Sequence, residues 1–511
     1  MTALAFPLCL LAVLAPLGAG RFIGRMYDGR AARVAAAVTA ASVLALAIAL
    51  CALQRTMGAD GRLVDPWLLA LWGEARPALG VDSLSAPLLV LVSVIALITI
   101  TAWPRHLLTP RALGTLLINK GLLIGLLTSL DFGLLTLFWI LATVPALIEL
   151  KRTQTTSTTS ALSRTWVVLL VVTALPMLGA TAALFWAGWT QGAAAPLHLT
   201  DLIAHGLQGR PGLIAGTLIA LAVILRGALL PAHGWVTQSF EQGPSGTLLL
   251  FWVTQPGAYL LARVLIPLFA SSSSVGPFRP DVLAVLALCT AIYAALLGLA
   301  QTDMKRVIGC LATSYGSIVI VGLLSRHVDG ISGGLVLWLS LGLALTGLAF
   351  TTVALEARTG TTDMRRLGGL SRTLPRLTAC FLVFGLAAVG LPGMLGFVAE
   401  DLLLHGVLES YPSIAATLLI ATVLNGINVM RVYTHVFVGE PPALAVKVPR
   451  DREMRRRERV AAVAIVGLLL VLGLIPQAVV SLRSDAAAQM AGQVTTNSKA
   501  RIMRLSRTHS R

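Results

Sequence analysis

Long apolar runs separated by short polar links recur along the whole chain. Crossing about 30 Å of hydrocarbon takes roughly 20 mostly apolar residues as a helix, because a helix satisfies its backbone hydrogen bonds within one segment. Short alternating strands, which a transmembrane barrel requires, do not occur. The pattern predicts an all-α integral membrane protein of about fourteen transmembrane helices, at residues 2–20, 32–53, 82–103, 111–129, 131–150, 165–188, 212–231, 245–268, 281–300, 305–325, 332–355, 376–398, 411–432 and 459–482.

Composition agrees with this prediction. Hydrophobic residues make up 56% of the 511 residues and charged residues only 12%, which is more apolar surface than a globular core can bury. The polar links are short, so we expect one membrane domain and no soluble domain. The first apolar run has no basic residue before it, which favours a first membrane helix over a cleaved signal peptide.

The formal net charge of +17 comes from basic clusters in alternate links. Such clusters are typical of cytoplasmic loops, and they argue against nucleic-acid binding. They predict a bacterial-type cytoplasmic (inner) membrane protein whose N-terminus faces outward. An even number of spans would put the basic C-terminal tail outside too, so either the tail tolerates this charge or the count differs by one. The clusters are Arg21–Arg33, Arg105–Arg111, Lys151–Arg164, Lys305–Arg306, Arg365–Arg376, Arg450–Arg459 and, in the tail, Lys499–Arg511.

The cysteines are scattered through apolar stretches. They form no CxxC pair and have no spacing suited to a zinc site or an iron–sulfur cluster. We therefore expect no metal and no redox centre. The five positions are Cys9, Cys51, Cys289, Cys310 and Cys380.

Proline and glycine interrupt two of the apolar runs. Arg226-Gly-Ala-Leu-Leu-Pro231 and Gly390-Leu-Pro-Gly-Met-Leu-Gly396 place helix breakers at membrane depth. Backbone groups freed there must face protein or a water-filled cavity. Two such breaks in the two halves of a chain suggest the repeat architecture of ion carriers. On the residues alone, ordinary loop ends explain the pattern equally well.

Ionisable side chains inside apolar runs are costly and are therefore candidates for function. Lys120 and Arg226 lie in two such runs, and the adjacent Glu400 and Asp401 follow the second break. Lysine can lose its proton when desolvated, whereas arginine effectively cannot. Arg226 is therefore expected to set the local field rather than relay a proton, and as a buried cation it needs a compensating partner.

Three further ionisable residues have ordinary alternatives. Asp131 and Glu149 lie near the two ends of one run and fit side chains that reach the headgroups. His233 follows the first break, where it serves either as a structural histidine or as a group that passes protons near neutral pH.

A series of short motifs recurs in a fixed order over most of residues 80–435. In this order the chain resembles the antiporter-like membrane subunits of respiratory complex I and of multisubunit cation/proton antiporters, and chain M of the NADH-quinone oxidoreductases most closely. The motifs are Asp82-Ser-Leu-Ser85, Arg226-Gly-Ala-Leu-Leu-Pro-Ala-His-Gly-Trp235, Pro244-Ser245, Gly257-Ala-Tyr259, Thr302-Asp303-Met-Lys305-Arg306-Val-Ile-Gly309, Asp363-Met-Arg-Arg-Leu-Gly-Gly369 and Leu391-Pro-Gly-Met-Leu-Gly-Phe-Val-Ala-Glu400.

The resemblance implies fourteen helices with two inverted five-helix repeats, each containing a broken helix. It implies three parts: N-terminal helices in 1–80, the antiporter-like core in 81–435, and a basic loop, a last helix and a basic tail in 436–511. It also implies a subunit without a cofactor, which conducts protons along a line of polar residues at mid-membrane. Other membrane subunits and a soluble catalytic partner would then complete a hetero-oligomeric complex.

The family's proton-path residues transfer unevenly to this chain. Glu400 keeps the family's residue, and His233 keeps its place at the break. The broken-helix lysine of the family falls on Arg226, and its key glutamate falls on Ile140. A relay needs groups that titrate and lie within reach of one another, which isoleucine cannot supply.

Further relay positions also differ from the family. An expected lysine falls on Gln255 or nearby, and two expected histidines fall on Tyr315 and Leu341, while Lys120 lies where chain M often has an acid. Either water and other residues restore a path, or the subunit has kept the scaffold and lost conduction. The predicted path residues are Glu400, Arg226, His233, Lys120, Gln255, Tyr315, Lys305 and Asp401.

Three functions remain open from the sequence. The first is a proton-translocating membrane subunit of an NADH-quinone-oxidoreductase-like complex, at most a non-catalytic subunit of a translocase. The second is a degenerate membrane anchor of a related complex, such as a membrane-bound hydrogenase or an energy-coupled inorganic-carbon uptake system. The third, a free-standing secondary transporter, is the weakest because the family works in assemblies.

Overall fold

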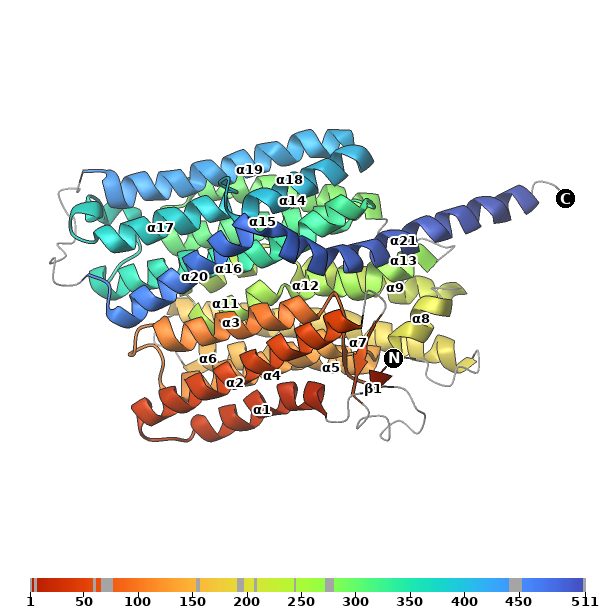
Figure 1. The fold of residues 1–511 in the computed structure, drawn as a ribbon, viewed down its shortest axis with the longest axis horizontal. Coiled ribbons are helices and arrows are strands. Elements are labelled where there is room, and N and C mark those ends of the chain that lie inside the picture. Colours follow the sequence, from red (N-terminus) through yellow and green to blue (C-terminus); the bar gives the residue numbers. More distant parts are fainter. Residues whose placement is uncertain are drawn as a thin grey trace.

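The computed structural model describes residues 2–3, 7–57, 61–65, 77–152, 157–190, 197–205, 209–242, 245–271, 280–440 and 453–508. Pro244, Arg450 and Arg511, which belong to motifs and clusters named above, lie outside these ranges. The described chain is almost entirely helical, and most helices run roughly parallel to one another in an elongated bundle (Figure 1).

The first ten helices lie between residues 8 and 242. They are α1 (Leu8–Ile23), α2 (Gly29–Thr56), α3 (Ala86–Ala102), α4 (Pro110–Thr128), α5 (Phe132–Leu141), α6 (Val144–Arg152), α7 (Ser157–Thr190), α8 (Leu199–His205), α9 (Gly209–Arg226) and α10 (Gly234–Gln242).

Eleven α-helices follow, with π-helical turns at Leu261–Leu265 and Thr434–Val438 and 3₁₀ turns at Met364–Arg366 and Leu370–Arg372. They are α11 (Ser245–Thr254), α12 (Pro256–Leu260), α13 (Ile266–Ser271), α14 (Pro280–Ala300), α15 (Met304–Leu323), α16 (Val328–Thr359), α17 (Pro375–Ala388), α18 (Leu395–Ser410), α19 (Pro412–Tyr433), α20 (Arg456–Leu474) and α21 (Pro476–Thr508).

Burial divides the helices into a centre and a periphery. In the most apolar 18-residue stretch of Gly246–Leu268 all residues are buried, and in that of Val328–Thr359 94% of the residues are. In Ser163–Thr190 the share is only 33%. Large apolar side chains are exposed on the peripheral helices, for example Leu175 on α7 and Val423 on α19. A helix that exposes such a surface needs hydrocarbon around it. The chain is a multi-pass membrane protein.

Among the described residues, ten helices are long and apolar enough to cross a membrane, or eleven if the bent pair α20–α21 counts as one span. The helices α1, α3 and α17 are apolar but shorter. The prediction of a helical membrane fold is confirmed. The number fourteen and the two inverted repeats stay predictions.

The two predicted helix breaks occur in the structure. α9 ends at Arg226 and α10 begins at Gly234, and α17 ends at Ala388 before α18 begins at Leu395. A third break was not predicted: Gln255, at φ 41°, separates α11 from α12 inside the run expected at 245–268.

The predicted last run, 459–482, is not one straight helix. Its chain bends by 76° between α20 and α21. Ile475 lies directly before Pro476, and the residue before a proline is disfavoured in helical backbone, which accounts for the bend. α21 then packs against α16 and α13 and extends past the bundle toward the C-terminus (Figure 1).

A small sheet closes the end of the bundle at which the N-terminus lies (Figure 1). Strand β1 (Thr2–Ala3) pairs in parallel with β2 (Leu63–Val64), which pairs antiparallel with β3 (Gly80–Val81). These two-residue strands were not predicted. They matter because Asp82 directly follows β3. Helices α2 and α20, which begin within or just after basic links, both start at the opposite end of the bundle.

Candidate functional site

Arg226 is the last residue of α9, and it is 1% exposed. One guanidinium nitrogen donates to the Trp139 carbonyl at 3.2 Å and another to the Thr173 hydroxyl at 2.8 Å. The guanidinium carbon lies 4.3 Å from the centroid of the Trp139 ring and 5.2 Å from that of Phe251. Aromatic faces and carbonyl oxygens stabilise a cation without an opposite charge.

No carboxylate pairs with Arg226 among the residues that the structure describes. The expected partner is therefore a set of neutral groups. They hold the guanidinium in one orientation, and none of them accepts a proton from it. Its Nε has no hydrogen-bond partner in the described chain.

The break after Arg226 lies against the break at Gln255. A Cβ on Gly257 would come within 2.4 Å of the Gly227 nitrogen, so only glycine permits this approach. The next residue along, Ala228, has φ 55°, which ends α9. The two interruptions therefore form one site.

Gln255 extends this site toward α15. It is 7% exposed. A Cβ on Gly316 would lie 3.1 Å from the Trp252 ring and 3.8 Å from Nε2 of Gln255, so α11 and α12 meet α15 beside Tyr315.

A second polar cluster lies at the other predicted break. Tyr315 on α15 and Ser340 on α16 are buried, and Glu400 on α18 is partly buried and close enough to Tyr315 to act on it electrostatically. The Ser340 hydroxyl lies 3.3 Å from the Cβ position of Gly396 in the first turn of α18. Oε1 of Glu400, the Tyr315 hydroxyl and the Ser340 hydroxyl have no hydrogen-bond partner in the described chain. A Cβ built on Gly390 would lie 2.9 Å from the Glu400 carboxylate, so the carboxylate packs directly against the Gly390 backbone within the break.

Four predicted residues thus share one strip between the two breaks: Arg226, Gln255, Tyr315 and Glu400. The other four lie elsewhere. His233 is half-buried and packs edge-on against Tyr293, with ring centroids 4.8 Å apart.

Lys120 on α4 is fully buried, and its Nζ donates to the Ala40 carbonyl of α2 at 3.2 Å. Its neighbour Asn119 points to the Thr247 carbonyl at 3.2 Å, and the Thr247 hydroxyl donates to Glu149 at 2.5 Å. Glu149 therefore has a partner inside the protein. Lys120 faces the N-terminal helices rather than the strip.

Lys305 and Asp401 lie outside the strip as well. Lys305 is 14% exposed by side chain, and its Nζ lies 2.7 Å from the Glu356 carboxylate. Asp401 is exposed.

The two Thr-Asp-Met motifs bind each other. Met304 donates its N–H to the Thr362 carbonyl at 3.0 Å, and Met364 donates to Thr302 at 2.8 Å. The Thr362 hydroxyl also donates to Asp303, which caps α15. The pairing holds the two links together, so the basic residues of both motifs lie at the same end of the bundle.

A family model described as "NADH:quinone oxidoreductase/Mrp antiporter, TM" matches residues 129–425, which include all three breaks. The chain belongs to this family. This family is the antiporter family.

Curated members of the antiporter family resemble the chain over about two thirds of its length. Subunit 13 of the NADH-quinone oxidoreductase of Thermus thermophilus is 32% identical over 336 residues, which are 65% of this chain and 69% of that protein. The F(420)H(2) dehydrogenase subunit M of Methanosarcina mazei is 28% identical over 353 residues, 68% of this chain and 71% of that one.

Solved structures extend the likeness to nearly the whole chain. A chain of respiratory complex I from Thermus thermophilus has a TM-score of 0.82 at 26% identity, covering 95% of this chain and 99% of that chain. A chain of the Mrp complex from Dietzia sp. has a TM-score of 0.83 at 19% identity, covering 96% and 98%, and supports the fold alone.

Two apolar residues, Ile140 and Leu341, occupy positions at which the resemblance predicts titrating groups. Ile140 follows Trp139, whose carbonyl and ring hold Arg226, and Leu341 follows Ser340 and is 1% exposed. The resemblance assigns an acid and a histidine to these two positions, and the isoleucine and leucine found there cannot titrate.

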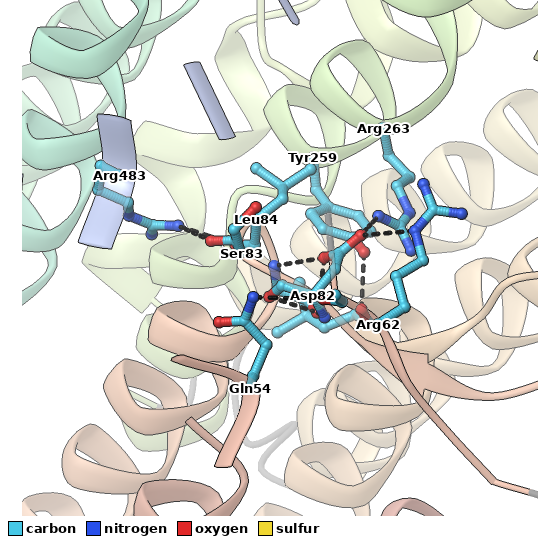
Figure 2. Close-up of polar contacts among 11 residues, drawn as sticks. Gln54, Arg62, Asp82, Ser83, Leu84, Tyr259, Arg263 and Arg483 are labelled. Carbon is cyan, nitrogen blue, oxygen red and sulfur yellow. Dashed lines mark hydrogen bonds and ion pairs between the residues drawn. The ribbon is translucent and has the colours of Figure 1, made fainter. Parts of the chain in front are cut away.

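One charged cluster was not predicted. Arg62 and Arg263 both point to the carboxylate of Asp82 (Figure 2). Arg263 is 7% exposed and forms an ion pair with Asp82, while Nε of Arg62 lies 3.8 Å from it. Arg483 of α21 donates to the Leu84 carbonyl at 2.8 Å beside them. Arg263 lies inside the apolar run at 245–268, and that position was the available signal.

Asp82 lies in the link before α3, outside the membrane-spanning helices. Burial alone would raise the pKa of its carboxyl, but Arg263 and Arg62 outweigh burial and lower it to about 2. The Ser85 backbone N–H donates to the same carboxylate at 3.1 Å. Asp82 is therefore a permanent anion that ties α3, the α11–α13 run and the link after α2 together.

Proposed function

We propose that the chain is a proton-translocating membrane subunit of a multisubunit complex resembling NADH-quinone oxidoreductase, and that protons pass through its second half, at Glu400. The observation that carries this proposal is the cluster of Glu400, Tyr315 and Ser340 at the α17–α18 break. Each presents a buried oxygen without a protein partner in the described chain.

Buried polar groups without partners are rare in native proteins, because each costs about 1–3 kcal/mol. Ordered water satisfies such groups when two or more of them converge. A carboxyl flanked by two hydroxyls and bridged by water can take up a proton, hold it and pass it on. Glu400 supplies the titrating group, and Tyr315 and Ser340 supply relay hydroxyls.

Arg226 has a different role in this proposal. Its charge is fixed and its contacts are neutral, so it holds the α9–α10 break in one arrangement without exchanging protons. Gln255 lies between Arg226 and Tyr315 and can orient water between them. Lys120, His233, Lys305 and Asp401 are not needed for this path.

The wider assembly is proposed from the named relatives, which are subunits of respiratory and Mrp complexes. Other membrane subunits would bind the chain, and a soluble partner would supply the energy. The core at 81–435, flanked by 1–80 and 436–511, would hold the path within a fourteen-helix, two-repeat fold in a bacterial inner membrane.

The test is proton flux in vesicles that contain the intact complex purified from native membranes. We expect Glu400→Gln to lower flux roughly tenfold or more, because glutamine cannot titrate. Asp401→Asn is the matched control: it removes the neighbouring carboxyl, which is exposed. Equal flux in Glu400→Gln and wild type would refute the proposal.

The neutral surroundings of Arg226, together with Ile140 and Leu341, favour a second candidate: an anchor subunit that no longer conducts. On that account Glu400→Gln and wild type show the same low flux, and Arg226→Ala lowers the yield of intact complex. A normal yield in Arg226→Ala would argue against the anchor.

A further inference from the structure

Among the residues that the structure describes, the cluster around Asp82 contains more positive than negative charge. Arg62, Arg263 and Arg483 converge on the segment Asp82–Leu84, and Asp82 is the carboxylate that the structure places among them (Figure 2). Two guanidinium groups therefore share one acid. The two positive charges repel each other, and a further anion between them would offset the energetic cost of this repulsion.

Arg263 presents donors that nothing in the described chain accepts. Its Nε and one of its terminal nitrogens have no hydrogen-bond partner, although the side chain is only 7% exposed. An unpaired buried donor on a charged group is costly. Burial also lowers the pKa of Arg62, and the neighbouring Arg263 lowers it further, so this cation too lacks full compensation.

A pocket opens beside these groups. Arg62, Asp82, Arg263 and Gln489 form its polar part, and apolar side chains form the rest, among them Leu199 of α8 and Met490 of α21. The site lies next to the β1–β3 sheet, at the end of the bundle opposite the starts of α2 and α20 (Figure 1). That end is the predicted outer headgroup level of the membrane.

We propose that this pocket binds the headgroup phosphate of an anionic phospholipid. A phosphodiester accepts hydrogen bonds from two guanidinium groups at once, and its charge offsets the excess that Asp82 leaves. The apolar wall then lies along the acyl chains. Met490 of α21 forms part of this wall, so the bound lipid contacts both α21 and the rest of the bundle and stabilises their packing.

The test is native mass spectrometry of the full-length chain in detergent, titrated with phosphatidylglycerol, phosphatidylcholine or inorganic phosphate. We expect phosphatidylglycerol to bind about tenfold more tightly than phosphatidylcholine, and Arg62→Gln to lower its affinity about tenfold, as the loss of one charge-assisted hydrogen bond predicts.

Arg55→Gln is the matched control. Arg55, in the last turn of α2, is exposed and donates to Ser481 at 3.4 Å, so its loss removes a nearby positive charge without touching the pocket. We expect its affinity for phosphatidylglycerol to stay within twofold of wild type. Arg263→Lys keeps the charge beside Asp82 but loses the planar fork, and we expect it to bind several-fold more weakly.

Three results would overturn the proposal. Equal binding of phosphatidylglycerol and phosphatidylcholine would remove the role of the excess charge. Equal losses in Arg62→Gln and Arg55→Gln would show a general surface attraction. Displacement of the lipid by millimolar inorganic phosphate would assign the pocket to a soluble anion. None of these results bears on proton flux through Glu400.

Discussion

Of the three helix breaks in the described chain, those after α9 and after α17 hold ionisable side chains of opposite charge. At the α9–α10 break, Arg226 is surrounded by a carbonyl, a hydroxyl and two aromatic faces. At the α17–α18 break, Glu400 lies near Tyr315, and the Ser340 hydroxyl lies 3.3 Å from the Cβ position of Gly396 in the first turn of the same helix; Oε1 of Glu400 and both hydroxyls have no hydrogen-bond partner in the described chain. The first break holds a fixed charge in a nearly satisfied shell, and the second holds a group that can titrate.

This difference shows that a broken helix in a membrane is not by itself a proton site. What distinguishes the two breaks is how far the surrounding protein groups fill the hydrogen-bonding capacity of the ionisable side chain and its neighbours. An arginine satisfied by carbonyl and ring contacts stabilises the break. A carboxyl next to unpartnered hydroxyls makes the break reactive.

The largest expected effect on stability is at the first break. Arg226→Ala removes the side chain that fills the space against Trp139 and Phe251, and we expect a loss of about 3 kcal/mol in the free energy of unfolding. Arg226→Met fills much of the same space without a buried charge, so we expect a stability within about 1 kcal/mol of wild type or higher. Thermal unfolding of the detergent-solubilised chain measures both. A loss in Arg226→Met as large as in Arg226→Ala would show that the charge itself holds the fold.

The next effect separates backbone strain from chemistry at the second break. Gly390 and Gly393 have φ of 80° and 90°, so alanine at either costs about 1–2 kcal/mol. A Cβ on Gly390 would meet Glu400 at 2.9 Å, whereas a Cβ on Gly393 would meet nothing within 4 Å. We expect Gly390→Ala to lower proton flux several-fold and Gly393→Ala to leave it near wild type. Equal flux in the two variants would mean that the position of Glu400 does not matter.

The smallest effect concerns two buried tyrosines. The Tyr259 hydroxyl donates to the Leu127 carbonyl at 2.6 Å, whereas the Tyr315 hydroxyl has no partner in the described chain. We expect Tyr259→Phe to cost about 1 kcal/mol of stability and leave flux unchanged. Tyr315→Phe is expected to cost less and to lower flux a few-fold. Unfolding midpoints and vesicle flux measure the pair, and the reverse pattern would remove Tyr315 from the path.

Much of the fold could be predicted from the sequence, because each membrane helix corresponds to a contiguous run of apolar residues. The breaks at Arg226 and Gly390 were also visible, since glycine and proline act locally. The break at Gln255 was missed although Pro256 follows it directly, because the hydropathy of the run concealed this local signal; the approach of Gly257 to Gly227 is a tertiary contact that the sequence does not show. The bend at Ile475 had a local signal in Pro476 that the hydropathy of the run concealed.

The site was less predictable than the fold. Arg226, Gln255, Tyr315 and Glu400 could be proposed from motif order, but the neutral shell of Arg226 depends on the Trp139 carbonyl, which no side-chain pattern reveals. Arg263 and Asp82 are 181 residues apart in the chain, so their ion pair had no local signal either. Contacts across the fold, rather than residue types, decide which charges are compensated.

The most direct measurement compares proton flux through Arg226→Met and Glu400→Gln in vesicles that contain the same intact complex. If the first break is structural and the second exchanges protons, Arg226→Met keeps flux within about twofold of wild type, and Glu400→Gln lowers it roughly tenfold or more. Loss of flux in Arg226→Met together with normal flux in Glu400→Gln would contradict this assignment of the two halves.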